Sequence, residues 1–426
     1  MTTIVDERPI DLEQTLDRVG ITPQQLYHHL TGAAAGAVST PDLLDPKLQR
    51  VGDAFAEPLR TSRVNPDALN DRLQKKFFPV APADPLTYGF CYKLTHEGQT
   101  LFKDRAHSAR VATPNLSVLN FTIPAVPGLP WDYDVPTNLC SVSKVITAIA
   151  MDLLLRERGI DPDKAVGFFL PSYWDFGPGT AAATFHSLMR HEAGLGSSYA
   201  GSGQGDFATA RSEMAATVGG PVGTPNYKNV NYAILRVAFP IVAGAIDRDV
   251  SFGPAYDDAF WDLVSATFYR DFVNERIFAP AGLGPFDFKA GPDAAYAYAT
   301  PPKPPGARLE DVTNNAGASG WHLNMNELMK VMAEFRYGGR IMSRRKAQMV
   351  QQHLYGFDEF QSTDAGTIYA KRGRFTNAGN TLDTAIYFIP GNLELGVFIN
   401  SDPGTGPNDS YNADILGLIA DSVETV

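Results

Sequence analysis

The sequence contains little cysteine and no basic surplus. Of its 426 residues two are cysteines, Cys91 and Cys140, and both stand in apolar surroundings without the spacing of metal ligands. We therefore expect two buried free thiols rather than a disulfide or a metal site, as is usual in a reducing compartment. The net charge of −11 leaves no excess of lysine and arginine to neutralise phosphates. This charge argues against nucleic acid or an anionic membrane as a partner.

Apolar runs of membrane-spanning length and targeting segments are also lacking. The segment from Met1 to Pro9 has no basic region and no apolar stretch of signal-peptide length, and no other window approaches a membrane span. The eight histidines show no metal spacing, and His191-Glu192 lacks the second histidine of an H-E-x-x-H zinc motif. We therefore expect a cytoplasmic protein that needs no metal and no other cofactor. The sequence does not predict its oligomeric state.

The chain is long enough for two or three domains, and 44% of its residues are hydrophobic, which allows a large core. Residues 1–80 carry short helical patterns broken by prolines, so we predict a helical N-terminal extension. Apolar runs separated by turn residues predict β-hairpins at residues 86–102 and 384–400.

These hairpins come from both ends of the chain, with helical segments between them, and this order predicts an α+β fold. Residues 81–155 and 301–426 would form an antiparallel sheet flanked by helices. Residues 156–300, with helical segments and loops rich in glycine and proline, would form an inserted, mostly helical domain. Further helices are predicted at residues 324–337 and, as a tail, at residues 412–423.

One lysine stands in a long apolar segment, where it has no structural reason to be. Residues 142–155 are apolar nearly all round, which is typical of a helix buried inside a domain. Asn138 and Gly159 are suited to cap this helix, which places Ser141 in its first turn, next to Lys144 on one face. An unpaired buried ammonium is costly, so we expect Lys144 to act on Ser141, in the S-x-x-K arrangement of acyl-transferring enzymes.

The S-x-x-K pattern occurs a second time, at Ser343 and Lys346. This copy lies among charged residues after Gly338-Gly339, where a lysine reaches water at little cost. We interpret it as the solvated start of a helix. The pattern by itself therefore does not identify an enzyme.

A further chemical candidate is Tyr227-Lys228-Asn229, which lies in a polar segment just before an apolar helical pattern. Such a tyrosine is usually an amphipathic side chain at a helix end. Together with Ser141 and Lys144, however, it resembles the Y-x-N motif of the serine β-lactamase and penicillin-binding-protein superfamily. The resemblance is to the class C β-lactamase-like branch, with its related esterases and D-amino-acid peptidases.

Other segments resemble this family in the family's own order. Residues 139–150 resemble its nucleophile segment, 188–195 its "LLTHTSGL" segment, 272–283 its "IFEPLGM" segment and 317–328 its "AGGLVSTANDL" segment. The resemblance covers residues 85–420. Several ordered matches are more specific than any one of them.

The resemblance implies a role for each matching residue. Ser141 would be the acylated nucleophile, and its backbone N–H would supply half of an oxyanion hole. Lys144 would hydrogen-bond Ser141 and share its proton. Tyr227 would act as general base and then protonate the leaving group. Asn229 would orient Lys144 and the substrate.

The chain departs from the family in the third motif. Relatives carry K-T-G or H-x-G at the start of a strand beside the site, where the cation binds a carboxylate of the substrate. From the spacing to Pro390 we prefer Asn377-Ala378-Gly379 to Lys371-Arg372-Gly373, with the N–H of Asn380 as a second oxyanion donor. A neutral Asn377 would weaken recognition of carboxylate-bearing substrates such as penicillins.

The sequence therefore predicts a serine hydrolase that forms an acyl-enzyme on Ser141 and acts on a small-molecule ester or amide. A carboxylesterase fits best, because the neutral third motif and the missing export signal both point away from the cell wall. An amidase, a D-aminopeptidase, a β-lactamase or an acyltransferase would use the same residues and stays open. An alternative of another class is a catalytically silent protein that binds a partner, which the intact Ser141, Lys144 and Tyr227 disfavour.

Overall fold

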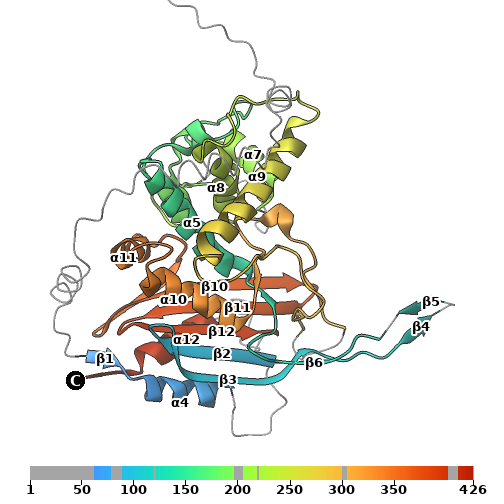
Figure 1. The fold of residues 1–426 in the computed structure, drawn as a ribbon, viewed down its shortest axis with the longest axis vertical. Coiled ribbons are helices and arrows are strands. Elements are labelled where there is room, and N and C mark those ends of the chain that lie inside the picture. The colour runs from blue at the N-terminus through green and yellow to red at the C-terminus, as the bar shows by residue number, and fades with distance from the viewer. Residues whose placement is uncertain are drawn as a thin grey trace, which may run out of the picture.

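The computed structural model of the chain describes residues 62–77, 89–118, 121–123, 125–195, 205–217, 220–299, 305–401 and 411–425. In this part of the chain, a β-sheet lies at one end and a group of helices at the other (Figure 1). Most of the predicted N-terminal extension lies outside the described residues. Its described part consists of the short strand β1 (Ser62–Val64) and the helix α4 (Pro66–Phe77).

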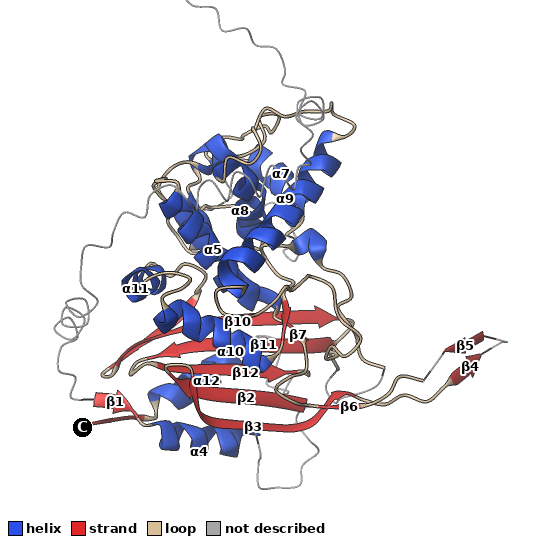
Figure 2. Cartoon of the chain, viewed as in Figure 1, coloured by secondary structure: helices blue, strands red, loops and turns tan. Residues whose placement is uncertain are grey.

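Both predicted hairpins are confirmed, and they join in one antiparallel sheet. The seven strands that the described residues contribute to it run in the order β6-β3-β2-β12-β11-β10-β9. Their bounds are β2 Gly89–His96, β3 Gln99–Arg110, β6 Leu129–Pro130, β9 Glu359–Thr363, β10 Gly366–Asn377, β11 Asn380–Ile389 and β12 Leu393–Ile399. Because β2 pairs with β12, strands from the two ends of the chain meet in the middle of the sheet (Figure 2).

The helices gather mainly between β3 and β9 in the sequence. The group at the end opposite the sheet consists of α5 Ser143–Glu157, α6 Phe185–Met189, α7 Phe207–Ala215, α8 Val230–Val242 and α9 Asp257–Val273. Two more, α10 Met325–Ala333 and α11 Arg344–Gln352, lead back to the sheet, and α12 Tyr411–Ala420 packs beside α4. Because the mixed arrangement of helices and antiparallel strands is present, the predicted α+β class is confirmed.

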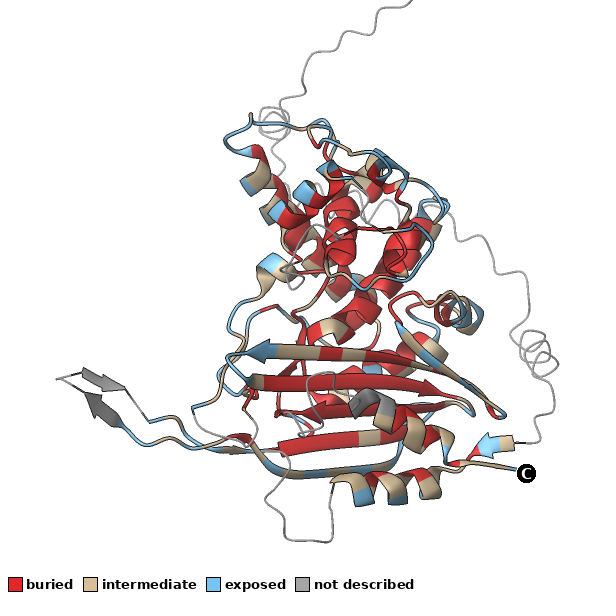
Figure 3. Cartoon of the chain, turned by 180° about the vertical axis from the view of Figure 1, so that it is seen from behind, coloured by how far each residue is buried: buried red, intermediate tan, exposed pale blue. Residues whose placement is uncertain are grey.

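Helices cover both faces of the sheet, which explains why its central strands are apolar at nearly every position. Along β12, Leu395 and Val397 point to one face, where they join a core with Leu69 of α4. Phe398 points to the other face and belongs to the large core that contains α5 and α10. Figure 3 shows these strands buried along most of their length.

The predicted helix at residues 324–337 is confirmed, and its start has the expected capping chemistry. Asn324 Oδ1 accepts from the N–H of Glu327 and Glu327 Oε2 accepts from the N–H of Asn324, both at 2.8 Å. These two bonds satisfy amides that the first helical turn leaves without a partner. The tail helix ends earlier than predicted, at Ala420, because the chain then forms β13 (Val423–Thr425) and pairs with β1.

Short paired strands complete the described part of the fold. They are β4 Leu116–Val118 with β5 Phe121–Ile123, and β7 Thr137–Asn138 with β8 His322–Leu323. The second pair ties the segment before Ser141 to the segment before α10. Among the described residues, no helix is both long and apolar enough to cross a membrane.

Candidate active site

Ser141 lies on a short turn that leads into the buried helix α5. The turn is a 3₁₀ helix of residues Cys140–Val142, and α5 follows directly. Asn138 does not cap α5 itself; its Oδ1 accepts from the N–H of Cys140 at 2.8 Å and so holds the turn. The predicted stop is confirmed, since α5 ends before Gly159, which has the positive φ of 63° that glycine adopts readily.

Lys144 is fully buried in the first turn of α5, as the sequence predicts. Its Nζ donates to Ser141 Oγ at 3.0 Å, to Asn229 Oδ1 at 2.7 Å and to the carbonyl O of Ala318 at 2.6 Å. Three acceptors match the three N–H bonds of an ammonium, so the charge is compensated by hydrogen bonds. Burial nevertheless lowers the pKa of Lys144 below its ordinary value.

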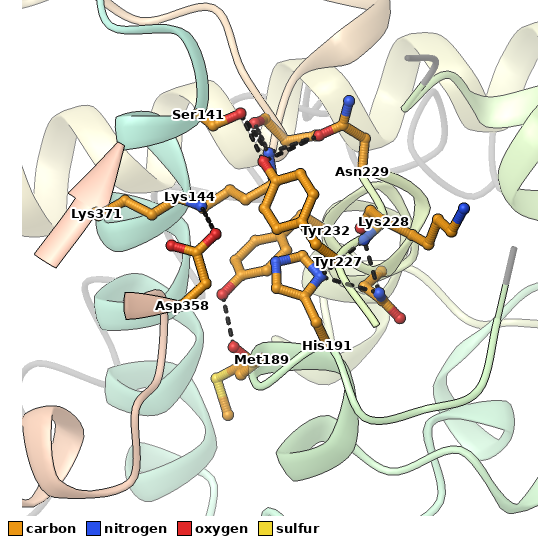
Figure 4. Close-up of polar contacts among 12 residues, drawn as sticks. Ser141, Lys144, Met189, His191, Tyr227, Lys228, Asn229, Tyr232, Asp358 and Lys371 are labelled. Carbon is orange, nitrogen blue, oxygen red and sulfur yellow. Dashed lines mark hydrogen bonds and ion pairs between the residues drawn. The ribbon is translucent and has the colours of Figure 1, made fainter. Parts of the chain in front are cut away.

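Tyr227 reaches Ser141 from the segment that leads into α8 (Figure 4). Its hydroxyl donates to Ser141 Oγ at 2.7 Å and lies 3.5 Å from Asn229 Oδ1. Desolvation by itself would raise the pKa of Tyr227, but the ammonium groups of Lys144 and Lys371 outweigh it and lower that pKa. Since 41% of Tyr227 remains exposed, solvent screens part of this effect.

Four of the predicted site residues therefore meet in one hydrogen-bonded cluster: Ser141, Lys144, Tyr227 and Asn229. They come from two elements, the start of α5 and the segment that leads into α8. Ser141 is partly exposed, whereas Lys144 is buried. The arrangement suits nucleophilic attack by Ser141 with proton transfer to a neighbouring group.

His191 holds the segment that carries Tyr227, a role that sequence reasoning missed. Its Nδ1 accepts from the backbone N–H of Lys228 at 3.3 Å and lies 3.0 Å from Asn231 Nδ2. The ring centres of His191 and Tyr227 are 4.4 Å apart. Burial and the two nearby lysines keep the pKa of His191 well below its ordinary value, so the ring stays neutral and its Nδ1 remains an acceptor. The position of His191 in the "LLTHTSGL"-like segment was the sequence signal that could have indicated this role.

The structure corrects the prediction for the third motif. Lys371 of β10, rather than Asn377, reaches the cluster: its Nζ lies 4.4 Å from the centre of the Tyr227 ring. Gly373, two residues further, packs on the nucleophile turn so closely that a Cβ there would lie 2.8 Å from Ser141 N and 2.5 Å from Leu139 O. Lys371-Arg372-Gly373 is thus the segment that adjoins Ser141.

Asn377, Gly379 and Asn380 lie at the far end of the same hairpin. Asn377 pairs with Asn380 across a turn made by Ala378 and Gly379, both with positive φ. Asn377 lies four residues beyond Gly373, which is ~13 Å along an extended strand. The prediction was wrong because Pro390 ends β11, the partner strand, and the spacing to it spans a tight turn that we had not placed.

The register of β10 shows to which edge of the strand each backbone amide points. Two-residue turns of this type close on a hydrogen-bonded pair, so Asn377, and every second residue before it, bonds to β11. The amides of Arg372 and Arg374 therefore point to the opposite edge of β10. That edge pairs with β9 from Gly366 to Ala370, whereas the contact of Gly373 with the nucleophile turn is made through a face of the strand.

Both side-chain cations of the Lys371-Arg372 pair have acidic partners. Lys371 Nζ lies 2.7 Å from Asp358 Oδ2, and Arg372 Nη2 lies 3.0 Å from Asp383 Oδ1. The side chain of Lys371 is 1% exposed and that of Asp358 is 26% exposed. Among the described residues, no group of three or more histidine, cysteine, aspartate or glutamate side chains is arranged to hold a metal ion.

Solved structures with this arrangement of helices and sheet are β-lactamase/transpeptidase-like proteins. One is a beta-lactamase/D-alanine carboxypeptidase from Yersinia pestis, with 15% identity and a TM-score of 0.58, covering 84% of this chain and 99% of that one. Another is a class C beta-lactamase from Rhodobacter sphaeroides, with 16% identity and a TM-score of 0.53 over 83% and 97% of the two chains. A third is EstCE1, a hydrolase with promiscuous acyltransferase activity, with 14% identity and a TM-score of 0.56 over 83% and 99%.

The sequence itself matches the Beta-lactamase family model over residues 96–417, and the chain belongs to this family. None of the curated proteins matches it. The resemblance drawn from the ordered motifs is thereby confirmed. The protein has the fold of a family of hydrolases, whose solved relatives carry different activities.

Proposed function

We propose that the protein is a serine hydrolase that forms an acyl-enzyme on Ser141 and acts on small carboxylic esters. The observation that carries this proposal is the chain of hydrogen bonds in which Ser141 Oγ accepts from both Lys144 and Tyr227, at 3.0 and 2.7 Å. A hydroxyl that contacts a buried ammonium and a phenol of lowered pKa has the surroundings of an activated nucleophile. A catalytically silent binding protein has no need of this arrangement.

Acylation would proceed by attack of Ser141 Oγ on the carbonyl carbon of the ester. The ammonium of Lys144 has no lone pair and cannot accept the serine proton, so the phenolate form of Tyr227 accepts it. Lys144 stabilises that phenolate and holds the serine oxygen in place. Tyr227 then gives the proton to the alkoxide that leaves. In the second half, a water molecule loses its proton to Tyr227 and attacks the acyl carbon, and Tyr227 returns the proton to Ser141 Oγ as the ester bond to the enzyme breaks.

The negative charge on the carbonyl oxygen would be stabilised by two backbone amides. One is the N–H of Ser141, at the start of the turn that leads into α5. The other would be the N–H of Arg374, which directly follows Gly373, the β10 residue that packs on that turn. Fixed amides of this kind are worth roughly 10²–10³-fold in kcat in serine hydrolases. Arg374 takes the place for which the sequence had suggested Asn380.

The preference for esters without a carboxylate no longer rests on Asn377 but on the charges around β10. Penicillins and peptidoglycan ends carry a carboxylate that needs a cation at the site. The Lys371 and Arg372 side chains already pair with Asp358 and Asp383. A charge pair that is satisfied inside the protein offers little to a second anion.

The direct test compares kcat/KM for p-nitrophenyl acetate, p-nitrophenyl butyrate, a cephalosporin and D-alanine p-nitroanilide on one preparation. We expect the two esters to be the best substrates and Ser141→Ala to lose their turnover. A higher kcat/KM for the cephalosporin or for the D-alanine anilide would replace the esterase by one of the other hydrolase activities. Added methanol in the same assay measures acyl transfer, because it yields a methyl ester in place of the acid.

A further inference from the structure

Asp358 belongs to a segment that is fixed on the nucleophile helix. The segment turns at Gly356, whose φ is +83° and whose N–H donates to Met189 O at 3.3 Å. A Cβ on Gly356 would lie 2.8 Å from the Cα of Val145 and 3.1 Å from the carbonyl O of Lys144. The backbone two residues before Asp358 thus lies directly against α5, one residue from the catalytic lysine. This close contact holds the backbone that leads to Asp358 against α5.

The Asp358 carboxylate and the Lys371 ammonium form a pair with unequal exposure. Their atoms Oδ2 and Nζ are 2.7 Å apart, and only 1% of the Lys371 side chain is exposed, against 26% for Asp358. The ammonium is therefore closed off from solvent, whereas the carboxylate paired with it is partly open to solvent. Burial alone would lower the pKa of Lys371, but Asp358 and Tyr227 outweigh it and raise that pKa, so the lysine stays charged.

The charges of the site balance when Tyr227 is ionised. Lys144 and Lys371 carry one positive charge each, and Asp358 and the Tyr227 phenolate carry one negative charge each. An additional carboxylate from a substrate would leave the cluster with a net negative charge in a partly buried site. It would also stand close to Asp358, because both would bind the same ammonium, and like charges repel most strongly where water is scarce.

We propose that Asp358 is a specificity-determining residue: by occupying Lys371, it makes the site prefer substrates without a carboxylate on the leaving group. Such a residue acts through its partner and need not contact the reacting atoms. The inference rests on the proposed function, because it concerns the substrates of the same acyl-enzyme site. In chemical terms, Lys371 would bind a carboxylate of the substrate if the Asp358 carboxylate were not already paired with it.

Two substrates that differ only in charge test this proposal. 3-Acetoxybenzoate and 3-acetoxybenzamide have the same acetyl group and leaving groups of the same shape, but only the first carries a carboxylate. We expect wild-type protein to prefer the benzamide. In Asp358→Asn, which keeps the shape of the side chain, we expect kcat/KM for the benzoate relative to the benzamide to rise roughly 10- to 100-fold, mostly through KM, because a charge-assisted hydrogen bond contributes on this scale.

Two further variants show whether the gain comes from Lys371. The gain should disappear in the double variant Asp358→Asn with Lys371→Met, which removes the released cation. Asp414→Asn is the matched control, since Asp414 pairs with Lys76 at the same distance of 2.7 Å, between α12 and α4 rather than at the site. It should leave the ratio of the two substrates unchanged. Should Asp358→Asn fail to fold, Asp358→Ser, which also removes the carboxylate, carries the same comparison.

The outcomes separate this inference from the proposed function. Turnover of 3-acetoxybenzamide through Ser141, with the same substrate ratio in wild type and Asp358→Asn, overturns the role of Asp358 and leaves the esterase standing. A gain that persists in the double variant also overturns it, because another cation would then bind the carboxylate. Absence of turnover for both esters, with no acetyl group on Ser141, overturns the proposed function and this inference with it.

Discussion

The Nζ atom of Lys371 lies 4.4 Å from the centre of the Tyr227 ring, and Lys144 Nζ lies 5.1 Å from the same point. One phenol is thus flanked by two ammonium groups from different elements, β10 and α5. Opposite charge at this range favours the ionised form of a titratable group. The cluster therefore contains a base whose pKa lies below the ordinary value of tyrosine.

The pH dependence of turnover reports this base. We expect the acid limb of kcat/KM for a neutral ester to follow the ionisation of Tyr227, at a pH below its ordinary pKa of 10.0. Lys371→Met removes a cation that lowers this pKa, so the limb should move to higher pH. Asp358→Asn removes an anion that raises it, so the limb should move to lower pH.

The other groups facing Tyr227 do not obscure this test. Lys144 stays in both variants, and His191 is neutral because its pKa lies well below the ordinary value. Lys346→Met is the control, since Lys346 belongs to the surface copy of the S-x-x-K pattern and is exposed at the start of α11. An acid limb that stays in place in both Lys371→Met and Asp358→Asn would mean that Tyr227 is not the titrating base.

The nucleophile can be identified by mass. After incubation with a slowly hydrolysed p-nitrophenyl ester or an alkyl phosphonate, we expect one adduct, on the peptide that contains Ser141. Ser141→Ala should lose it. Ser343→Ala should keep it, because Ser343 only precedes the surface helix α11. An adduct that survives in Ser141→Ala would falsify the assignment of the nucleophile.

Much of the fold and half of the site were predictable from sequence, because the signals were local. Apolar runs with turn residues between them gave both hairpins, and an apolar run interrupted by Lys144 gave the buried helix. The pairing of Ser141 with Lys144 is also local, three residues along one turn. The ordered motifs added Tyr227 and Asn229. The contact between Lys144 and Asn229 joins residues 85 positions apart in the sequence.

The rest depends on packing that no local pattern encodes. Lys371 lies on a strand that continues into a tight turn, and the choice between it and Asn377 required the register of β10 with β11. Asp358 belongs to no recognisable motif. It lies beside the site because Gly356 allows the backbone of its segment to contact α5. His191 looked like an incomplete metal motif, whereas its role follows from its bond to the amide of Lys228.

Lys144 and Tyr227 should behave as one unit in proton transfer. Each single change, Lys144→Ala or Tyr227→Phe, is expected to lower kcat roughly 10²–10⁴-fold, the usual cost of losing a general base. The double change should cost much less than the product of the two losses, because Lys144 acts by stabilising the Tyr227 phenolate that takes the proton of Ser141. The cycle is measured with one ester, and folding is checked by circular dichroism. Fully multiplicative losses, or near wild-type turnover in either single variant, would contradict this mechanism.

Two glycines on the same hairpin offer a matched test of which segment adjoins the nucleophile. In Gly373→Ala the new methyl group would lie 2.5 Å from Leu139 O and 2.8 Å from Ser141 N, so β10 must move away from the turn and carry the amide of Arg374 with it. We expect kcat to fall roughly 10²-fold or more, as when one oxyanion donor is lost. In Gly379→Ala the methyl group meets nothing within 4 Å, and the cost is the strain of a positive φ of 83°, about 1–2 kcal/mol of stability.

Gly379→Ala should therefore lower the midpoint of thermal unfolding and leave kcat nearly unchanged. Steady-state kinetics and thermal unfolding on both variants separate the two effects. The opposite result, with a large loss of kcat in Gly379→Ala and a mild one in Gly373→Ala, would return the third motif to Asn377-Ala378-Gly379. It would also argue against the amide of Arg374 as an oxyanion donor, because β10 would then tolerate a side chain at position 373, directly against the nucleophile turn.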